Sequence, residues 1–212
     1  MTSVIIPTFN EQEELPETLR HLARNSAEHE VIVVDAGSSD ETCRIAQANG
    51  ARVKNSPRKQ RATQMNLGVK AVRGDSLLFL HADTWLTGES LSKIQTVLNN
   101  PKYVGGGFAR RFRSPSLFLQ MTCCLAELRC RAFGWFLGDQ AIFVRRDVFE
   151  KLNGFPDLDQ FEDLDFCRRM KKCGPWATLK PPVLSSARRF REGPLKRTLA
   201  DLRLTAHYLK SA

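Results

Sequence analysis

Asp83 stands just after an apolar segment, where carboxylates of α/β proteins commonly meet their ligands. The segment 77–80 (LLFL) predicts a buried strand, and only His81 and Ala82 separate it from Asp83. An ionised carboxylate beside a buried strand is unfavourable unless another charge pairs with it. A hard divalent cation that prefers oxygen ligands, Mg²⁺ or Mn²⁺, is the natural partner. We therefore predict that Asp83 binds a metal ion that in turn holds a diphosphate.

Three further polar residues follow the first two apolar segments. Asp35 ends the segment 30–35 (EVIVVD), where its carboxylate could accept hydrogen bonds from a base or a ribose, or could equally cap the following helix. Thr8 and Glu11 stand just past the segment 4–7 and would face the same crevice. Glu11 alone is weak evidence, because acidic residues are common in the first turn of a helix.

A second acidic cluster, Glu162 and Asp163, opens the segment FEDLDFCRRM. The dipole at a helix N-terminus keeps such carboxylates ionised, which suits a general base and suits ordinary capping equally well. Asp139 and Gln140 precede the apolar segment 141–144 and could contact an acceptor hydroxyl or only form a turn. These four residues are candidates for the acceptor side of a reaction.

Arginines near the expected strand ends could bind phosphate. Arg61 lies near the start of an expected helix, where its guanidinium could contact an anion, although a solvated position is favoured by spacing alone. Arg188, Arg189 and Arg191 are close enough together to clamp a leaving diphosphate if their segment folds over the site. The alternative for this segment is a solvated loop.

The first hundred residues alternate strongly between strand and helix patterns. The expected strands are 4–7, 30–35, 51–54 and 77–81, and the expected helices are one capped by Asn10, one from Ser38 to Gly50, and one over 59–72. Continuous apolar strands that alternate with helices indicate a mostly parallel, Rossmann-like sheet covered on both faces. Its ligand site should lie beyond the carboxyl ends of the strands. No G-x-G-x-x-G or Walker A sequence occurs there.

The second half of the chain has a mixed pattern. Gly105, Gly106 and Gly107 indicate either a close backbone approach or a simple bend in a strand. The expected elements that follow are helices over 116–131, 147–152, 162–173 and 195–210, a strand over 141–144, and a strand pair or extended return over 177–190. No linker or repeat divides the chain, so we predict one domain, with a nucleotide-binding half (1–100) and an acceptor-binding half (101–212).

Composition narrows the class of protein. The formal charge of +9 is concentrated after residue 107, which suggests an anionic partner: nucleic acid, anionic lipid or a phosphorylated small molecule. No apolar run reaches the roughly 18 residues of a membrane span, and the segment 117–137 reads as amphipathic. The six cysteines contain no Cys-x-x-Cys, so a zinc site is not expected. Because the N-terminus carries no charged leader, we expect a cytoplasmic protein with reduced cysteines.

Five segments together resemble the inverting family 2 glycosyltransferases with the GT-A fold, and the lysine- and arginine-rich ending is similar to a short, soluble bacterial subgroup. They run in the family's order from residue 3 to about 174: SVIIPTFNEQEEL, EVIVVDAGSSDET, RATQMNLGVKAVRGDSLLFLHADT, GDQAIFVRRDVFEKLNGFPD and FEDLDFCRRMKKCG. The resemblance implies a non-processive, hexosyltransferase-type enzyme, because the Gln-x-x-Arg-Trp motif of the processive members is missing. It implies a nucleotide-diphospho-sugar donor, with UDP favoured, a hydroxyl acceptor and no nucleic acid.

The resemblance also implies roles for single residues. It places Pro7, Thr8, Glu11 and Asp35 on the base and ribose of the nucleotide. The resemblance makes Asp163 the catalytic base of the Glu-Asp motif. Asp163 would take the proton of the acceptor hydroxyl while that oxygen attacks the anomeric carbon from the face opposite the leaving group.

The implied metal site departs from the family pattern at one position. Asp83 matches the last carboxylate of the Asp-x-Asp motif, but His81 stands where the family usually has the first aspartate. His81 could weaken metal binding, or could itself contact the metal or the ribose. Arg188 or Arg189 would stabilise the departing diphosphate.

Two other functions remain open at this stage. A nucleotidyltransferase would carry a glycine-rich, lysine-bearing loop after its first strand, which PTFNEQEE lacks. A catalytically silent nucleotide-binding or membrane-surface protein would use the basic second half. The apolar stretch 117–136 could pack inside the domain, meet a second subunit or touch a lipid-linked acceptor, and we expect a homodimer slightly more than a monomer.

Overall fold

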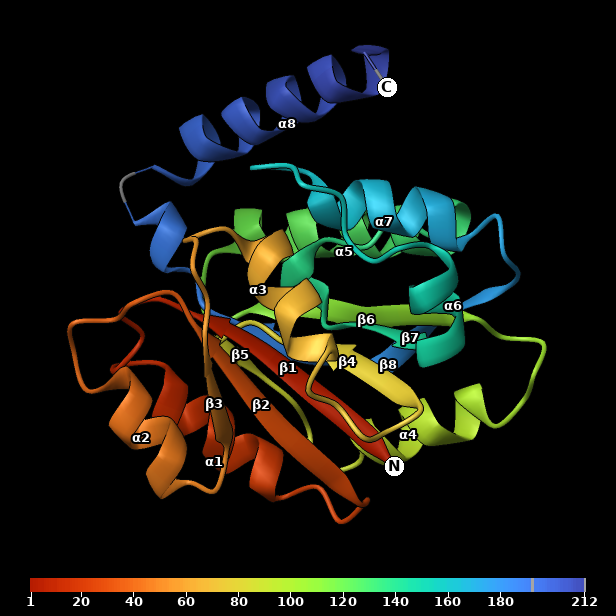
Figure 1. Ribbon diagram of the computed structural model, residues 1–212. Helices are drawn as coiled ribbons and strands as arrows, with labels where there is room; N and C mark the ends of the chain where they lie inside the picture. The colour runs from red at the N-terminus through yellow and green to blue at the C-terminus, as the bar shows by residue number, and fades with distance from the viewer. Residues whose placement is uncertain (192, 212) are drawn as a thin grey trace.

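The computed structural model describes residues 1–191 and 193–211, and its centre is one curled, mixed sheet of eight strands (Figure 1). The order of the strands across the sheet is β3-β2-β1-β4-β7-β6-β8-β5. Their bounds are β1 Thr2–Thr8, β2 His29–Asp35, β3 Arg52–Asn55, β4 Ser76–Phe79, β5 Thr84–Trp85, β6 Gly105–Phe112, β7 Ile142–Arg145 and β8 Trp176–Ser185.

The first four strands are parallel and carry the nucleotide-type half that the sequence predicts. β1 pairs with β2 from Thr2 opposite His29 to Thr8 opposite Asp35, so both strands end at the same level. Their apolar residues are buried on both faces because helices cover the sheet on each side. The predicted α/β class is therefore confirmed.

The remaining strands make the sheet mixed. β7 runs antiparallel to β4, β6 antiparallel to β7, β8 parallel to β6, and β5 antiparallel to β8. The glycine run lies in β6, where the neighbouring backbones come very close: a Cβ on Gly106 would meet the carbonyl oxygen of Ala177 at 2.0 Å. The structure therefore supports the close backbone approach predicted for this glycine run.

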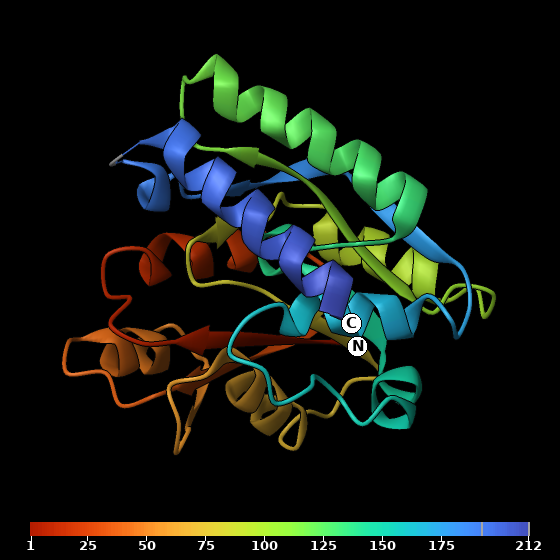
Figure 2. The same ribbon diagram turned by 90° about the horizontal axis from the view of Figure 1, so that it is seen from above.

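Helices pack on the two faces of the sheet and form two hydrophobic cores (Figures 1 and 2). α1, α2 and α4 cover one face, while α3, α6, α7 and part of α5 cover the other. The helices are α1 Leu15–Ala23, α2 Thr42–Ala48, α3 Arg61–Val69, α4 Ser90–Leu98, α5 Leu117–Phe133, α6 Arg146–Lys151, α7 Glu162–Met170 and α8 Pro194–Ser211, with 3₁₀ turns η1 Gly138–Gln140 and η2 Arg188–Phe190. Within the described ranges, no helix is both long and apolar enough to cross a membrane.

Local details of the first two loops differ from the expected helix caps. Asn10 does not cap α1, which begins five residues later at Leu15. Instead the side-chain oxygen of Asn10 accepts a hydrogen bond from the Ser39 backbone at 2.9 Å, and the Asn10 backbone N–H donates to the Ser38 hydroxyl at 2.8 Å. α2 likewise begins at Thr42 without a side-chain cap, so these polar residues join the two loops to each other.

Of the two structures predicted for the segment 177–190, a strand pair and a single extended return, the second is observed. It contains the single strand β8, which ends at Ser185 and leads into η2. The short strand β5 had no counterpart in the sequence prediction, because two residues are too few to carry a strand pattern. Helix α4 was also not predicted.

Candidate active site

Thr8 and Asp35 meet at the carboxyl ends of β1 and β2. The Thr8 hydroxyl donates to Asp35 at 3.0 Å, and the backbone N–H groups of Gly37 and Ser38 donate to the same carboxylate at 2.9 and 2.7 Å. Burial raises the pKa of Asp35, but the hydrogen bonds from Ser38 and Thr8 outweigh it, so the net pKa lies below its ordinary value. Asp35 thus stays ionised and fixes the loop after β2.

Arg188 joins this edge of the sheet to the end of the chain. Its guanidinium makes two hydrogen bonds to the Glu11 carboxylate, at 2.8 and 2.6 Å, and its Nε lies 3.3 Å from an oxygen of Asp83. The bond to Glu11 raises the pKa of Arg188, which keeps its positive charge. Burial raises the pKa of Asp83, and Arg188 opposes that shift only in part. Three predicted site residues from the two halves of the chain are therefore in direct contact.

His81, Gly138 and Asp163 form the centre of the cluster. The Gly138 N–H donates to Asp163 at 2.7 Å, and a Cβ on Gly138 would lie only 2.3 Å from Nε2 of His81. Glycine at 138 therefore lets η1 approach the imidazole ring closely. Burial, followed by the nearby Arg61, lowers the pKa of His81 to about 4, so the ring is neutral at physiological pH. A neutral imidazole can act as a ligand or a hydrogen-bonding partner, but not as a cation.

Glu162, beside Asp163 at the start of α7, is 2% exposed. Arg61, the first residue of α3, contacts it with 2.8 Å between Nε and Oε1. Burial first, and then the charge of Asp163, raises the pKa of Glu162, while Arg61 opposes the shift. Oε2 of Glu162 has no hydrogen-bond partner among the described residues. Asp163 itself is 7% exposed and lies at the positive end of the helix dipole of α7.

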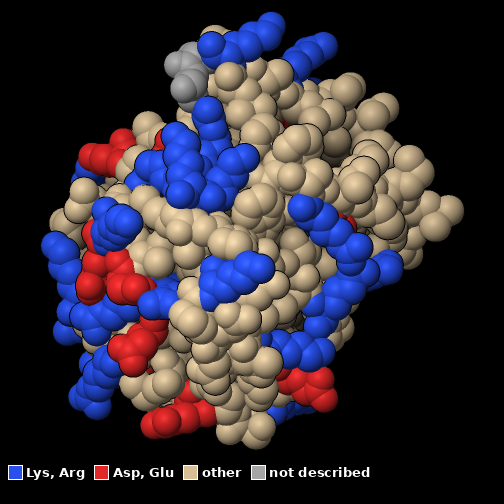
Figure 3. Space-filling model, turned by 90° about the vertical axis from the view of Figure 1, so that its right-hand side faces the viewer, with Lys and Arg blue, Asp and Glu red and all other residues tan. Residues whose placement is uncertain are grey.

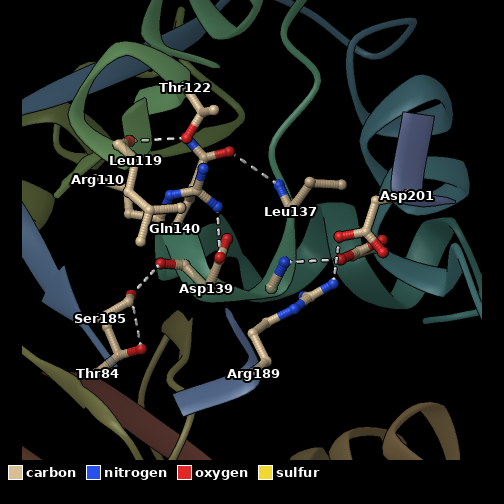
Figure 4. A network of polar contacts seen from close by, with 12 residues as sticks. Thr84, Arg110, Leu119, Thr122, Leu137, Asp139, Gln140, Ser185, Arg189 and Asp201 are labelled. Atoms are coloured by element: carbon tan, nitrogen blue, oxygen red, sulfur yellow. Dashed lines mark hydrogen bonds and ion pairs between the residues drawn. The ribbon is translucent and has the colours of Figure 1, made fainter. Parts of the chain in front are cut away.

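Asp139 is held by Arg110, a residue of β6 that the sequence analysis did not single out (Figure 4). The two charged groups form a largely buried ion pair, and the Asp139 carbonyl accepts a hydrogen bond from Ser185 at 2.9 Å. Burial raises the pKa of Asp139, but Arg110 outweighs it and the net pKa is lowered. Asp139 therefore lies in the cluster as an ionised carboxylate.

Gln140 points away from the cluster. It is fully buried, and its amide accepts from Arg129 at 2.7 Å and donates to the Phe108 carbonyl at 3.2 Å. In the structure Gln140 supports the turn η1, and it presents no surface to an acceptor.

Arg189 pairs with Asp201 of α8 (Figure 4). Its charge contributes to the lowered pKa values of His81 and Asp139, which places it near both. The sequence did not indicate that Arg110 and Asp201 belong to the site, because each pairs with a partner at least 12 residues away in the chain.

A family model described as "Glycosyl transferase family 2" matches residues 3–152 of this chain. The undecaprenyl-phosphate 4-deoxy-4-formamido-L-arabinose transferase of Klebsiella pneumoniae subsp. pneumoniae is 30% identical over 156 residues, which cover 68% of this chain and 47% of that protein. The chain thus spans about half the length of this curated relative.

Two solved structures share the fold at low identity. The mannosyltransferase PcManGT from Pyrobaculum calidifontis, in complex with GDP-Man and Mn²⁺, superposes with a TM-score of 0.70 at 21% identity, covering 87% of this chain and 56% of that one. S. aureus TarS 1-349, in complex with UDP-GlcNAc, superposes with a TM-score of 0.69 at 18% identity, covering 87% and 58%. These likenesses confirm the GT-A fold that the sequence predicts.

Proposed function

Because the chain belongs to glycosyl transferase family 2, we propose that it transfers a sugar from a nucleotide-diphospho-sugar to an acceptor hydroxyl, with inversion and without processivity. The observation that carries this proposal is the meeting of two sets of residues. The ends of β1, β2 and β4 present Thr8, Asp35 and Asp83, and Asp163 is held beside His81 by a hydrogen bond from Gly138. A donor on the first set would place its sugar near the second.

In this proposal the nucleotide lies on the nucleotide-binding half (1–100) of a single domain. Pro7, Thr8 and Asp35 would contact the base and ribose, and Glu11 would join them once Arg188 leaves it. Arg61, Arg188 and Arg189 would bind the diphosphate, because their guanidinium groups form a charged edge around Asp83 and His81. We favour UDP as the nucleotide. The complex of TarS with UDP-GlcNAc supports this choice, whereas the complex of PcManGT contains GDP-Man.

A divalent cation, Mg²⁺ or Mn²⁺, would be held by Asp83 and the neutral ring of His81, with oxygens of the diphosphate as further ligands. Among the described residues, no group of three His, Cys, Asp or Glu side chains could hold such an ion alone, so the donor must supply ligands. The half-buried carboxylate of Asp83, which pairs with Arg188, fits this group. When bound, the cation neutralises charge on the leaving diphosphate.

Asp163 would act as the general base. It would take the proton from the acceptor hydroxyl as that oxygen forms a bond to the anomeric carbon, while the bond from this carbon to the diphosphate oxygen breaks. Arg188 or Arg189 would stabilise the charge on the released nucleoside diphosphate. Asp139 and Glu162 would face the acceptor, whereas the buried Gln140 would support the turn that presents Asp139. The acceptor-binding half would be residues 101–212.

The donor site can be tested by calorimetric titration of UDP, GDP and dTDP, each with Mn²⁺, Mg²⁺ or a chelator. We expect metal-dependent binding of one nucleotide, with UDP first, and loss of that binding in Asp83→Ala. Asp75→Ala is the matched control, because Asp75 lies at the opposite end of β4. Failure of all three nucleotides to bind the folded protein would overturn the proposal. The cytoplasmic location and the homodimer also remain proposals, which fractionation and light scattering of the natural protein would test.

A further inference from the structure

Exposed apolar side chains are concentrated on two helices. Ten large hydrophobic residues are exposed in the described chain, and all of them except Met1 lie on α5 or α8. They are Leu117, Met121, Leu125, Leu128 and Phe133 on α5, and Leu195, Leu199, Leu202 and Leu204 on α8. Such a concentration marks an interaction surface, because single exposed apolar residues would be scattered.

On α5 the exposed residues form one stripe. Leu117, Met121, Leu125 and Leu128 follow each other at intervals of four, four and three residues, which puts them on one side of the helix. The opposite side carries Leu119, Cys123, Ala126 and Cys130, all buried against the rest of the protein. Packing inside the domain therefore accounts for one side of α5 and leaves the other uncovered.

On α8 the contacts with the rest of the chain also use one side. The Tyr208 ring stacks on Phe161 with 4.9 Å between ring centroids, its hydroxyl donates to Asp165 at 3.2 Å, and Asp201 pairs with Arg189. Leu195, Leu199 and Leu202, at intervals of four and three residues, lie on a different side and are 47% to 60% exposed. We call these three residues and the α5 stripe the outer apolar surface.

Both helices begin beside the same pocket and lie on the same side of the molecule. Ser116 and Leu119 at the start of α5 and Pro194 at the start of α8 line one open cavity of about 390 Å³. Seen from above, α8 runs alongside α5 in nearly the same direction (Figure 2). One extended partner on this side of the molecule could therefore reach both helices.

The charges around the outer apolar surface are mostly positive. α8 carries four exposed basic residues, Lys196, Arg197, Arg203 and Lys210, and one acidic residue, Asp201, which pairs with Arg189 and Arg197. The one acidic residue of α5, Glu127, pairs with Arg131 and Lys180. Figure 3 shows, at its upper right, a broad area almost without charged side chains and Lys and Arg along its borders.

We propose that the outer apolar surface docks on the anionic face of a lipid bilayer. Leucines on one side of a helix and Lys or Arg beside them are the pattern of helices that lie in the plane of a membrane interface. The basic residues would meet acidic headgroups while the leucines enter the acyl boundary. A second copy of the chain is the less suitable partner, because a symmetric contact would bring the basic borders of both copies together. This inference is independent of the proposed catalytic activity.

The test is co-sedimentation of the full protein with vesicles. We expect binding to vesicles of phosphatidylethanolamine and phosphatidylglycerol, much weaker binding to phosphatidylcholine alone, and weakening when salt rises from about 0.1 M to about 1 M. Leu202→Gln should weaken binding about tenfold, because one leucine no longer enters the bilayer. Leu204→Gln is the matched control, since Leu204 lies about 200° around the same helix from Leu202.

A second pair of variants tests the charges. Lys196→Glu with Arg203→Glu lowers the formal charge from +9 by four units to +5 and should weaken binding about 30-fold. Arg20→Glu with Arg44→Glu makes the same change on α1 and α2 and should have a much smaller effect.

Three outcomes would overturn the proposal. One is failure of the folded wild type to bind anionic vesicles. Another is a dimer that Leu202→Gln dissociates, together with no vesicle binding, because the surface would then belong to a second copy. Equal effects of each variant and its control would assign any lipid binding to another part of the protein and would also overturn it.

Discussion

Asp35 at the end of β2 is held mostly by its neighbours in the chain, whereas Asp139 of η1 and Glu162 of α7 are held by distant partners. Asp35 receives hydrogen bonds from Gly37 and Ser38, two and three residues away. Asp139 depends instead on Arg110, 29 residues away, and Glu162 on Arg61, 101 positions earlier in the sequence. The Asp35 carboxylate is thus fixed mainly by local hydrogen bonds, and the Asp139 and Glu162 carboxylates are fixed by tertiary ion pairs.

This difference has an energetic consequence. Hydrogen bonds within a loop form as the loop folds, and losing one costs about 1 kcal/mol. An ion pair taken out of water is stable only while both partners are present, and removing one leaves an uncompensated buried charge. The contacts of Asp139 and Glu162 should therefore be more sensitive to single substitutions than those of Asp35.

The largest expected effect is on the reaction itself. Asp163→Asn should lower the rate of sugar transfer by about 10² to 10⁴, because the base is lost, while calorimetric binding of the donor nucleotide stays unchanged. Asp165→Asn in the same helix is the control and should keep most of the rate. Undiminished transfer by Asp163→Asn would remove Asp163 from the catalytic role and would place the chemistry elsewhere.

A smaller effect is expected on stability, and it compares the two sides directly. Arg110→Met should lower the free energy of unfolding by about 3 to 5 kcal/mol in urea titrations, because it strands the Asp139 carboxylate. Thr8→Val, which removes one hydrogen bond to Asp35, should lower it by only about 1 kcal/mol. Adding Asp139→Asn to Arg110→Met should restore part of the loss. Equal losses from the two single variants would refute the contrast.

A further effect on stability concerns pH. His81 has a folded-state pKa of about 4 against an ordinary 6.5, so between these values the unfolded chain binds more protons than the folded one. The associated stability is fully present above pH 6.5 and is lost as the pH falls toward 4, by at most about 3 kcal/mol. Urea titrations of the ligand-free protein at several pH values should show this slope, and His81→Gln should flatten it. His207→Gln on α8 controls for the loss of a histidine, and an unchanged slope in His81→Gln would contradict the prediction.

The positions of the donor-side residues could be predicted from the sequence because the strand patterns that place them are local. Continuous apolar segments indicate parallel strands, and the polar residues that follow them, such as Thr8, Asp35 and Asp83, must then lie at one edge of the sheet. The helix and strand bounds agree within a few residues for the same reason. Asn10 is an exception: it was predicted to cap α1, but it joins two loops. The sequence does not distinguish these roles, because asparagine suits both.

The acceptor side could be predicted only in part. The sequence identified Asp139, Glu162 and Asp163 as polar residues near expected turns, but not their partners, since an arginine in a strand such as Arg110 usually faces solvent. Gln140 shows the same limit, because the direction of a side chain in a tight turn depends on the packing of β6 and α5 around it.

The bridge that Arg188 makes between Glu11 and Asp83 gives the proposed enzyme a resident counter-ion. Without a donor, the single positive charge of Arg188 weakens the repulsion between the two carboxylates, and one negative charge of the three groups is left over. An incoming diphosphate with its metal would exchange partners with this arginine and would turn it from the carboxylates toward the phosphates. The free energy of donor binding would then be the difference between the ion pairs that form and those that break. Donor binding would also change the contacts that hold η2 and the chain that follows it.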